Sequence, residues 1–573
     1  MRTFSVLKNS FAAGQYDVPM SARKDVGGFE SAAFALKNVV GLPRGGVEQR
    51  GGMKKIVEIS ASSDAIRLFS FKFNQSQKYV IVFHPLKIDI VYEGAIATTV
   101  VSPYTADDIP DLCVVQQLDA MIICSQNHPP AKLMRQGAHD SWSYAAITFT
   151  NPPQYDFTGT PEAAWSATRG YPACCNFHEG RLFFGATPSL PNMVWGSKTN
   201  APFDFTTTVN LLDDEAVSAQ LQGGSAVSII RSISSYLGFF VFTTEGPYAL
   251  TKSPITPKNF LPVRHESTPA GRFQAQEMDG AMLFLTSADG NLRPAVNEFV
   301  WDSNKSQFET NDLNIRCYNV LKNPVGMACR RGNETDAANH LFVVNDDGTM
   351  AVLNLKRAQQ MVGWSTADTQ GKVLSVCVLD ADVYFLVKRK IASADKYFVE
   401  QIDRSRTLDC SVAVTQSPAS VTVSGLNAFE GETVDVVADD APIGKRTVES
   451  GAITLPIAAS KIEVGFAFDV EITPFPPAVD DKEGGTNLIS ERWSITKLSL
   501  MLENTLGCKV NGKEIVAPKF GTDVFDVVNS QITGWKDASV FGWIEPENQK
   551  PVVLTTTSDK RITLHAVNME VLV

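Results

Sequence analysis

The sequence lacks the patterns that identify membrane proteins, metal sites and disulfide-bonded domains. No apolar run approaches the roughly 20 residues of a membrane-spanning helix, and the first residues, MRTFSVLKNSFAAGQYD, contain no sustained apolar stretch of a signal peptide. The nine cysteines include no Cys-x-x-Cys pair, and the seven histidines show no metal-ligand spacing. We therefore expect buried free thiols in a reducing compartment, no metal and no cofactor.

Motifs of the common enzyme classes are also missing. The sequence contains no G-x-S-x-G, P-loop or H-E-x-x-H motif. The formal net charge of −11 argues against a surface that grips nucleic acid by neutralising phosphates. The same charge is compatible with a channel wall along which nucleic acid slides without sticking.

What the sequence does contain is a long series of short β patterns. Four apolar segments at 65–73, 78–83, 87–92 and 95–101 are separated by turns, which is the strand content of one propeller blade. A unit of strand, polar turn and second strand then recurs at spacings of roughly 40 to 65 residues, within the range of propeller repeats. Seven such units begin near Lys78, Leu118, His178, Tyr236, Asp279, Asn339 and Asp380. The pattern predicts a β-propeller, and two or three separate β-sandwiches are the alternative.

At 573 residues the chain is too long for one compact core, which predicts two to four domains. We expect a mainly β protein with a β-propeller-like core, an N-terminal arm and additional small β domains. The expected boundaries are an arm at 1–60, a propeller at 61–415, a small β domain at 416–475 and a C-terminal β region at 476–573. Helical patterns are limited to 29–38, 106–117 and 312–322.

The N-terminal arm is rich in glycine and positive charge. Three Gly-Gly doublets begin at Gly27, Gly45 and Gly51, with arginines and lysines around them. Glycine allows close backbone approach and positive φ angles. The segment either packs over the first domain of its own chain or docks on a neighbouring subunit.

This segment resembles the N-terminal signature of the tail nozzle proteins of short-tailed bacteriophages, also called tail tubular protein B. The family pattern is Phe-x-x-Gly, Arg-x-Asp, an Asn before apolar residues, Pro-x-Gly-Gly and Arg-Pro-Gly. The matching positions are Phe11, Gly14, Arg23, Asp25, Asn38, Pro43, Gly45, Gly46, Arg50 and Gly51. The chain departs from the family at Gln15, where a Glu is usual, and in lacking the Pro after Arg50.

The resemblance continues in order along the chain and covers most of residues 10–475. Its most specific block combines Gly170-Tyr171-Pro172, Arg181-Leu182 and Val194-Trp195-Gly196-Ser197-Lys198. Further matches are Ser102-Pro103-Tyr104-Thr105, Asp108, Leu112, Gln116, Pro129-Pro130, Leu133, Arg135 and Gly363-Trp364. Many relatives carry an inserted β domain where this chain has only the short link 153–165.

The resemblance implies a structural virion protein and not an enzyme. It implies a homohexameric ring below the tail adaptor ring that bears fibres or spikes and gates the channel for genomic DNA. The protein would be made in the host cytoplasm and reside in the phage tail. We assign Arg23, Asp25, Arg44 and Arg50 to an inter-subunit interface, and we expect deletion of residues 1–55 to leave a folded monomer that cannot form rings.

The alternative is a carbohydrate-binding or carbohydrate-hydrolysing propeller that recognises a receptor. A glycosidase needs two carboxylates about 5 to 10 Å apart. The candidates are Asp119, Glu179, Glu245, Asp279 and Asp347, whose turn positions suggest the rim of the propeller. The acidic triplet 213–215 fits a solvated loop better than a cation site, and the tryptophans fit packing better than stacking on sugars.

Overall fold

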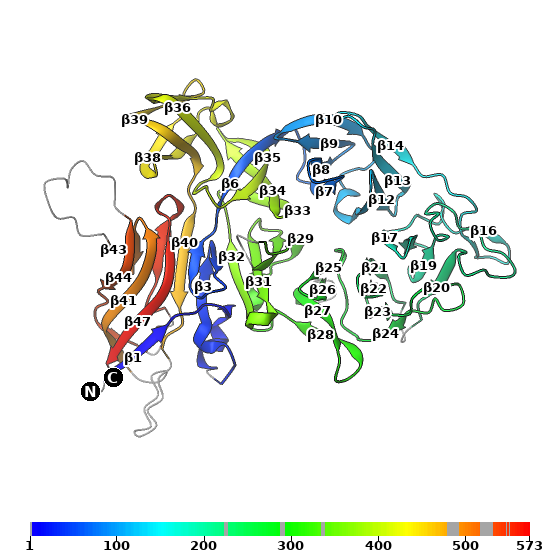
Figure 1. Cartoon of the computed structure of the whole chain (residues 1–573), viewed down its shortest axis with the longest axis horizontal. Coiled ribbons are helices and arrows are strands. Elements are labelled where there is room, and N and C mark those ends of the chain that lie inside the picture. Colours follow the sequence, from blue (N-terminus) through cyan, green and yellow to red (C-terminus); the bar gives the residue numbers. More distant parts are fainter. Residues whose placement is uncertain are drawn as a thin grey trace.

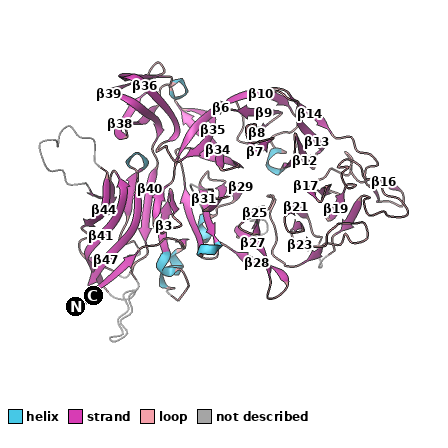
Figure 2. Cartoon of the chain, viewed as in Figure 1, coloured by secondary structure: helices cyan, strands magenta, loops and turns pink. Residues whose placement is uncertain are grey.

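The computed structural model describes residues 3–23, 25–222, 227–286, 293–333, 338–477, 492–515, 531–545, 547–548 and 550–572. The described chain is built from strands, with a few single turns of 3-10 helix (Figure 2). A ring of blades occupies one end of the molecule, a sandwich that contains both termini occupies the other, and a small β domain lies beside their junction (Figure 1).

The ring consists of seven four-stranded antiparallel blades in the described chain, which confirms the predicted β-propeller core; five blades are separate sheets, and the last two are parts of larger sheets. The first three blades contain β7 (Arg67–Lys72), β8 (Lys78–His84), β9 (Lys87–Tyr92) and β10 (Ala95–Val101); β11 (Cys113–Gln117), β12 (Ala120–Ser125), β13 (His128–Arg135) and β14 (Trp142–Ala146); and β17 (Cys174–His178), β18 (Arg181–Gly185), β19 (Met193–Gly196) and β20 (Val217–Gln220).

The next three blades follow in chain order around the ring. They contain β21 (Ile230–Ser235), β22 (Phe239–Thr243), β23 (Gly246–Leu250) and β24 (Val263–Arg264); β25 (Gln276–Met278), β26 (Ala281–Thr286), β27 (Ala295–Asp302) and β28 (Gln307–Asp312); and β29 (Pro324–Arg330), β30 (Asn339–Asn345), β31 (Met350–Lys356) and β32 (Met361–Ala367).

The seventh blade closes the ring with a strand from the N-terminal part of the chain. Its strands are β33 (Lys372–Leu379), β34 (Asp382–Ile391) and β35 (Ala394–Asp403), and the fourth, outermost strand is β6 (Gly52–Ile59). Hydrophobic clusters join every consecutive pair of blades, including the last and the first, where Leu386 packs with Val82. Closure removes the open sheet edges that a linear array would expose.

The N-terminal segment is part of a folded core and not a separate arm. β1 (Thr3–Lys8) pairs with β47 (Thr563–Leu572), and β4 (Val39–Gly41) and β5 (Val47–Gln49) extend the same sheet. The other strands of this sheet are β41 (Trp493–Thr505), β44 (Ile532–Ala538) and β45 (Trp543–Ile544). Phe11, Leu36 and Val47 are buried in one cluster with apolar side chains of the C-terminal strands.

The helix expected at 29–38 is wrong. Only Phe29–Ser31 forms a 3-10 turn, and β3 (Ala32–Lys37) is a strand between β32 and β40 (Asp469–Pro474). β2 (Gly14–Gln15) also pairs with β3 and β32, so one sheet runs from blade six through β40 to β46 (Leu554–Thr557), β42 (Cys508–Val510) and β43 (Lys513–Ile515). Backbone pairing on both sides of β3 outweighs the helical spacing of its apolar residues.

This arrangement also corrects the expectation for a chain without residues 1–55. The deletion would remove β1 to β5 and half of β6, so it would open the core of the sandwich and the closure of the propeller. We therefore expect the truncated chain to be destabilised, not to persist as a folded monomer.

The small β domain begins and ends earlier than expected. It contains β36 (Asp409–Ser424), β37 (Thr433–Ala438), β38 (Ala441–Thr447) and β39 (Ala452–Phe466) around a core that includes Phe429. The helices expected at 106–117 and 312–322 are reduced to the 3-10 turns Ile109–Asp111 and Tyr318–Val320. The link 153–165 holds only the hairpin β15 (Gln154–Asp156) and β16 (Pro161–Ala163).

Candidate functional site

Residues of the N-terminal signature build a buried contact between the three parts of the chain, which we call the signature junction: Asn38, Arg50, Asp368, Asp409 and Phe468. The guanidinium of Arg50 donates two hydrogen bonds to the carboxylate of Asp409, at 2.9 and 2.7 Å. It also donates to Oδ1 of Asn38 at 2.9 Å and to the carbonyl of Asp368 at 2.8 Å, and it lies 3.6 Å from the ring centroid of Phe468.

The signature junction therefore ties the propeller, the small β domain and the sandwich to one side chain. Asp368 follows blade six, Asp409 begins the small domain, and Phe468 belongs to the core of the sandwich. Arg50 is 7% exposed and Asp409 is fully buried. A buried bidentate ion pair whose hydrogen-bond donors are satisfied fixes the relative orientation of the parts that it joins. Moving either domain would leave an unpaired charge in the interior.

Two glycines that match the family pattern, Gly14 and Gly363, also lie against one another in the structure. Gly14 pairs with Trp364 in parallel register, and a Cβ at Gly14 would lie 2.3 Å from the backbone nitrogen of Trp364. A Cβ at Gly363 would lie 2.7 Å from the carbonyl oxygen of Ala12. Because glycine has no Cβ, only glycine at these positions allows the two backbone segments to approach so closely.

The other residues assigned to an interface lie on the surface. Arg23 and Asp25 are exposed and form a bidentate pair with one another at 2.8 Å, and this hydrogen bonding lowers the pKa of the Asp25 carboxyl. Arg44 is exposed in the turn between β4 and β5. Arg50, by contrast, is inside its own chain, so the structure gives it an intrachain contact.

The carboxylates considered for glycoside hydrolysis lie on opposite faces of the ring. Asp119, Glu179 and Asp279 are in turns between the first and second strands of their blades. Glu245 and Asp347 are in turns between the second and third strands, which reach the other face because the strands are antiparallel. Each belongs to a different blade, so the five do not converge at the propeller centre.

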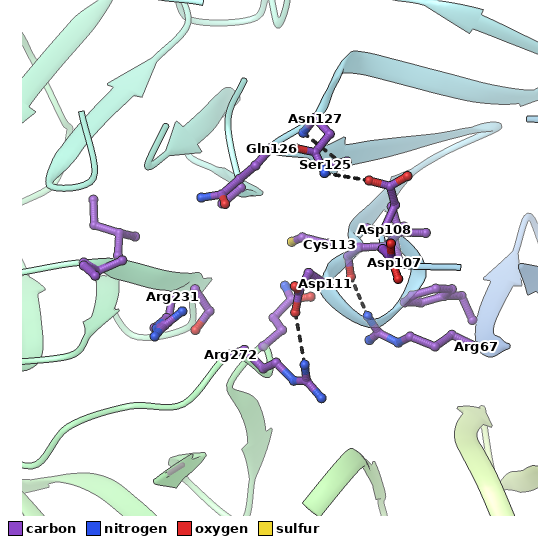
Figure 3. A pocket seen from close by; sticks show the side chains of 18 residues that line it. Arg67, Asp107, Asp108, Asp111, Cys113, Ser125, Gln126, Asn127, Arg231 and Arg272 are labelled. Atoms are coloured by element: carbon purple, nitrogen blue, oxygen red, sulfur yellow. Dashed lines mark hydrogen bonds and ion pairs between the residues drawn. The ribbon is translucent and has the colours of Figure 1, made fainter. Parts of the chain in front are cut away.

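A polar pocket lies at one mouth of the propeller, which we call the mouth pocket. It is a cavity of about 150 Å³ lined by the beginnings of the innermost strands of several blades and by the loop before β11. Gln274 is one of its polar lining residues. Figure 3 labels charged and polar side chains that line it from separate blades: Arg67, Asp107, Asp108, Asp111, Asn127, Arg231 and Arg272.

Burial and hydrogen bonds shift the pKa values of two side chains that line the mouth pocket. Burial lowers the pKa of the Arg67 guanidinium to about 10, and the nearby positive charge of Arg272 adds to this effect. Burial opposes ionisation of Asp108, but hydrogen bonds from Asn127, Thr105 and His128 outweigh it and hold the pKa of that carboxyl at about 2.

A second cavity lies at the centre of the propeller. This cavity of about 410 Å³ is lined by the innermost strand of every blade, through Phe69, Val115, Asn176, Ser234, Gln276, Ala328 and Cys377.

Within the described ranges, no group of three or more His, Cys, Asp or Glu side chains is arranged to hold a metal ion. Of the triplet 213–215, the carbonyls of Asp213 and Glu215 accept hydrogen bonds from the buried Arg181, and Asp214 pairs with Lys198 at 3.1 Å. No helix among the described residues is long and apolar enough to cross a membrane.

Comparisons with known proteins give no family. No family model and no curated protein matches the sequence. Among solved structures, the chain is similar to BBS1N in complex with ARL6DN, with 11% identity and a TM-score of 0.38 over 62% of this chain and 98% of that one. It is also similar to Chaetomium thermophilum Raptor (9%, TM-score 0.38, over 63% and 29%) and to the Neurospora crassa Pan2 WD40 domain (10%, TM-score 0.33, over 61% and 89%). Similarities this low do not bear on function.

Sequence reasoning missed the mouth pocket entirely. Arg67 and Arg272 lie in the first and fifth blades, and no local motif links them. Only the closed ring brings both side chains to one cavity.

Proposed function

We propose that the chain is a structural subunit of the tail nozzle of a short-tailed bacteriophage, present in the virion after synthesis in the host cytoplasm. The observation that carries the proposal is the convergence of signature residues. Asn38 and Arg50 of the N-terminal signature meet at the signature junction, and Gly14 meets Gly363, although these two glycines match the family in segments far apart in the chain. Convergence of this kind is expected when the matches describe one structural unit.

A rigid subunit suits a ring that surrounds a channel of constant width. The signature junction and the sheet that runs from blade six into the sandwich hold the parts of the chain at one relative orientation. In the proposed homohexamer, DNA passes between subunits and not through the propeller centre. The tail adaptor ring and the fibres or spikes are the proposed neighbours, and loops at the ring interior would gate the channel.

Electron microscopy of the purified protein tests the proposal directly. We expect negative-stain images at micromolar protein to show closed rings of about six subunits around an open centre. A protein that remains monomeric at every concentration, with and without the adaptor ring, would overturn the proposal.

Charge reversal tests the interface within the same images. We expect Arg23→Glu combined with Arg44→Glu to reduce ring formation while the subunit stays folded, because both side chains are exposed near the glycine turns. The control is Arg169→Glu, which removes a partly exposed ion pair with Glu162 in another part of the chain. Equal loss of rings in both variants would count against the assignment of Arg23 and Arg44.

The alternative of a carbohydrate-binding or carbohydrate-hydrolysing propeller can be tested separately. Its candidate carboxylates come from five different blades and are divided between the two faces of the ring, which does not favour the hydrolytic version. Release of reducing sugar from host polysaccharide by the purified protein would support the hydrolytic alternative.

A further inference from the structure

Four of the nine cysteines lie together where blade two packs against blade three. Cys113 begins β11 and is the register partner of Cys124 in β12. Cys174 and Cys175 begin β17, the innermost strand of blade three, which lies beside β11. Cys113 and Cys175 are 62 positions apart in the chain, so only the packing of the two blades brings them together.

Three of these thiols face one another, and we call them the inter-blade thiols: Cys113, Cys124 and Cys175. Sγ of Cys113 lies 3.8 Å from the carbonyl oxygen of Cys175. The thiol of Cys175 forms hydrogen bonds with the thiols of both Cys113 and Cys124. Cys174 points to the opposite face of its strand, where its Sγ donates to the carbonyl of Gly185 at 3.6 Å.

Cys113 is the inter-blade thiol that small molecules can reach. It is only partly buried, and it is among the lining side chains of the mouth pocket that Figure 3 labels. Cys124 and Cys175 are fully buried. The hydrogen bond with Cys175 and burial raise the pKa of the Cys113 thiol well above its ordinary value, and the positive charge of Arg67 opposes this shift. The thiol is therefore protonated at neutral pH, and its reactivity should rise with pH because the thiolate is the nucleophile.

We propose that Cys113 and Cys175 form a reversible disulfide that joins blade two to blade three when the protein leaves a reducing compartment. The oxidant is a small-molecule disulfide. Cys113 loses its proton to water, and its thiolate attacks one sulfur of the oxidant, whose S–S bond breaks and whose other sulfur leaves and takes up a proton.

The second step closes the bond between the blades. Cys175 loses its proton, and its thiolate attacks Sγ of Cys113, which releases the second small thiol. The protein loses two hydrogens and two electrons in all, and the small disulfide is reduced to two thiols. Cys175 is the expected partner because Cys113 contacts both its main chain and its thiol, whereas Cys124 hydrogen-bonds to Cys175.

The expected consequence is a more stable propeller. The new bond closes a loop between residues 62 positions apart, and a cross-link of this kind restricts the unfolded chain. In the reduced protein, the two blades are held at this place by the packing of apolar side chains. Oxidation would therefore strengthen a contact that is already formed, without moving the blades.

The experiment incubates the fully reduced, folded chain with hydroxyethyl disulfide at neutral and at mildly alkaline pH. We expect the number of free thiols to fall by two from nine, and mass spectrometry of peptides to identify a Cys113–Cys175 link. The link should form faster at the higher pH. The urea midpoint should rise on oxidation and return to its starting value after dithiothreitol.

Alanine variants identify the two thiols. Cys113→Ala and Cys175→Ala should each abolish the linked peptide and the rise of the urea midpoint. The matched control is Cys329→Ala, which removes another partly buried thiol, in blade six, and should oxidise like the wild type. Circular dichroism checks that each variant is folded, and the peptide map of the wild type needs no variant.

Three outcomes would overturn the proposal. The first is an unchanged number of free thiols in the folded wild type at both pH values. The second is a link from Cys113 to Cys124 or Cys174, or a stable mixed disulfide on Cys113, because either would show that Cys175 does not reach it. The third is a Cys113–Cys175 link that forms only in urea. This test is independent of ring formation.

Discussion

Removing the side chain of Arg50 should destabilise the junction between the three parts of the chain. In Arg50→Ala, the buried carboxylate of Asp409 loses two charged donors and keeps a backbone donor, the N–H of Met53 at 3.1 Å. Removing one partner of a buried ion pair costs about 3 to 5 kcal/mol. The lost stacking on Phe468 adds to this cost.

The assay is urea denaturation followed by tryptophan fluorescence and, in parallel, limited proteolysis. Because a chain of several domains need not unfold in one step, both readouts are required. We expect an earlier unfolding midpoint and new cleavage near residues 404–409 and 467–469, where the parts meet. Arg44→Ala is the matched control, since Arg44 is an exposed arginine of the same segment, and its effect should stay within about 0.5 kcal/mol.

A double-mutant cycle separates the ion pair from the packing around it. Asp409→Ala should also destabilise the chain, and Arg50→Ala combined with Asp409→Ala should cost less than the sum of the single changes because the two charges are coupled. An unfolding midpoint in Arg50→Ala equal to that of Arg44→Ala would refute the role given to the signature junction.

Two further predictions concern backbone packing and pH. Gly363→Ala should destabilise the chain by about 1 to 3 kcal/mol, because its Cβ would meet the carbonyl of Ala12 at 2.7 Å, whereas Gly326→Ala, where the Cβ meets open space, should be near neutral in urea denaturation. The folded-state pKa of Asp108, about 2, lies below its ordinary value of 3.8, so its ionised form contributes about 2 kcal/mol that is present above pH 4 and lost as the pH falls from about 4 to 2. Urea midpoints measured across this range should converge for the wild type and Asp108→Asn, and a constant gap between them would contradict the prediction.

The sequence predicted the propeller because its signal is local. Each unit needs only an apolar strand, a polar turn and a second strand, and the turns at Glu179-Gly180 and Asp279-Gly280 lie where the pattern places them. The units beginning near Lys78 to Asp380 became the seven blades. Alternation of side chains and turn chemistry are properties of a few neighbouring residues, so no tertiary information was needed.

The role of the N-terminal segment depended on contacts that the sequence does not display. The apolar spacing of Phe29 to Lys37 is compatible with a helix, and only the pairing of β3 with β32 and β40 makes it a strand. Arg50 is a charged residue in a glycine-rich stretch, a pattern typical of the protein surface. Its side chain is nevertheless buried and forms an ion pair with Asp409.

The amino-acid sequence alone thus determined the β class of the chain, its repeating blades and the residues on which the resemblance rests. The tertiary structure alone decided that the first strands complete the sandwich, that β6 closes the ring, and that Arg67 and Arg272 share one pocket. The physical reason is distance along the chain. Local patterns encode hydrogen-bonded turns and alternating faces, whereas ring closure and buried ion pairs join segments whose spatial proximity no local pattern encodes.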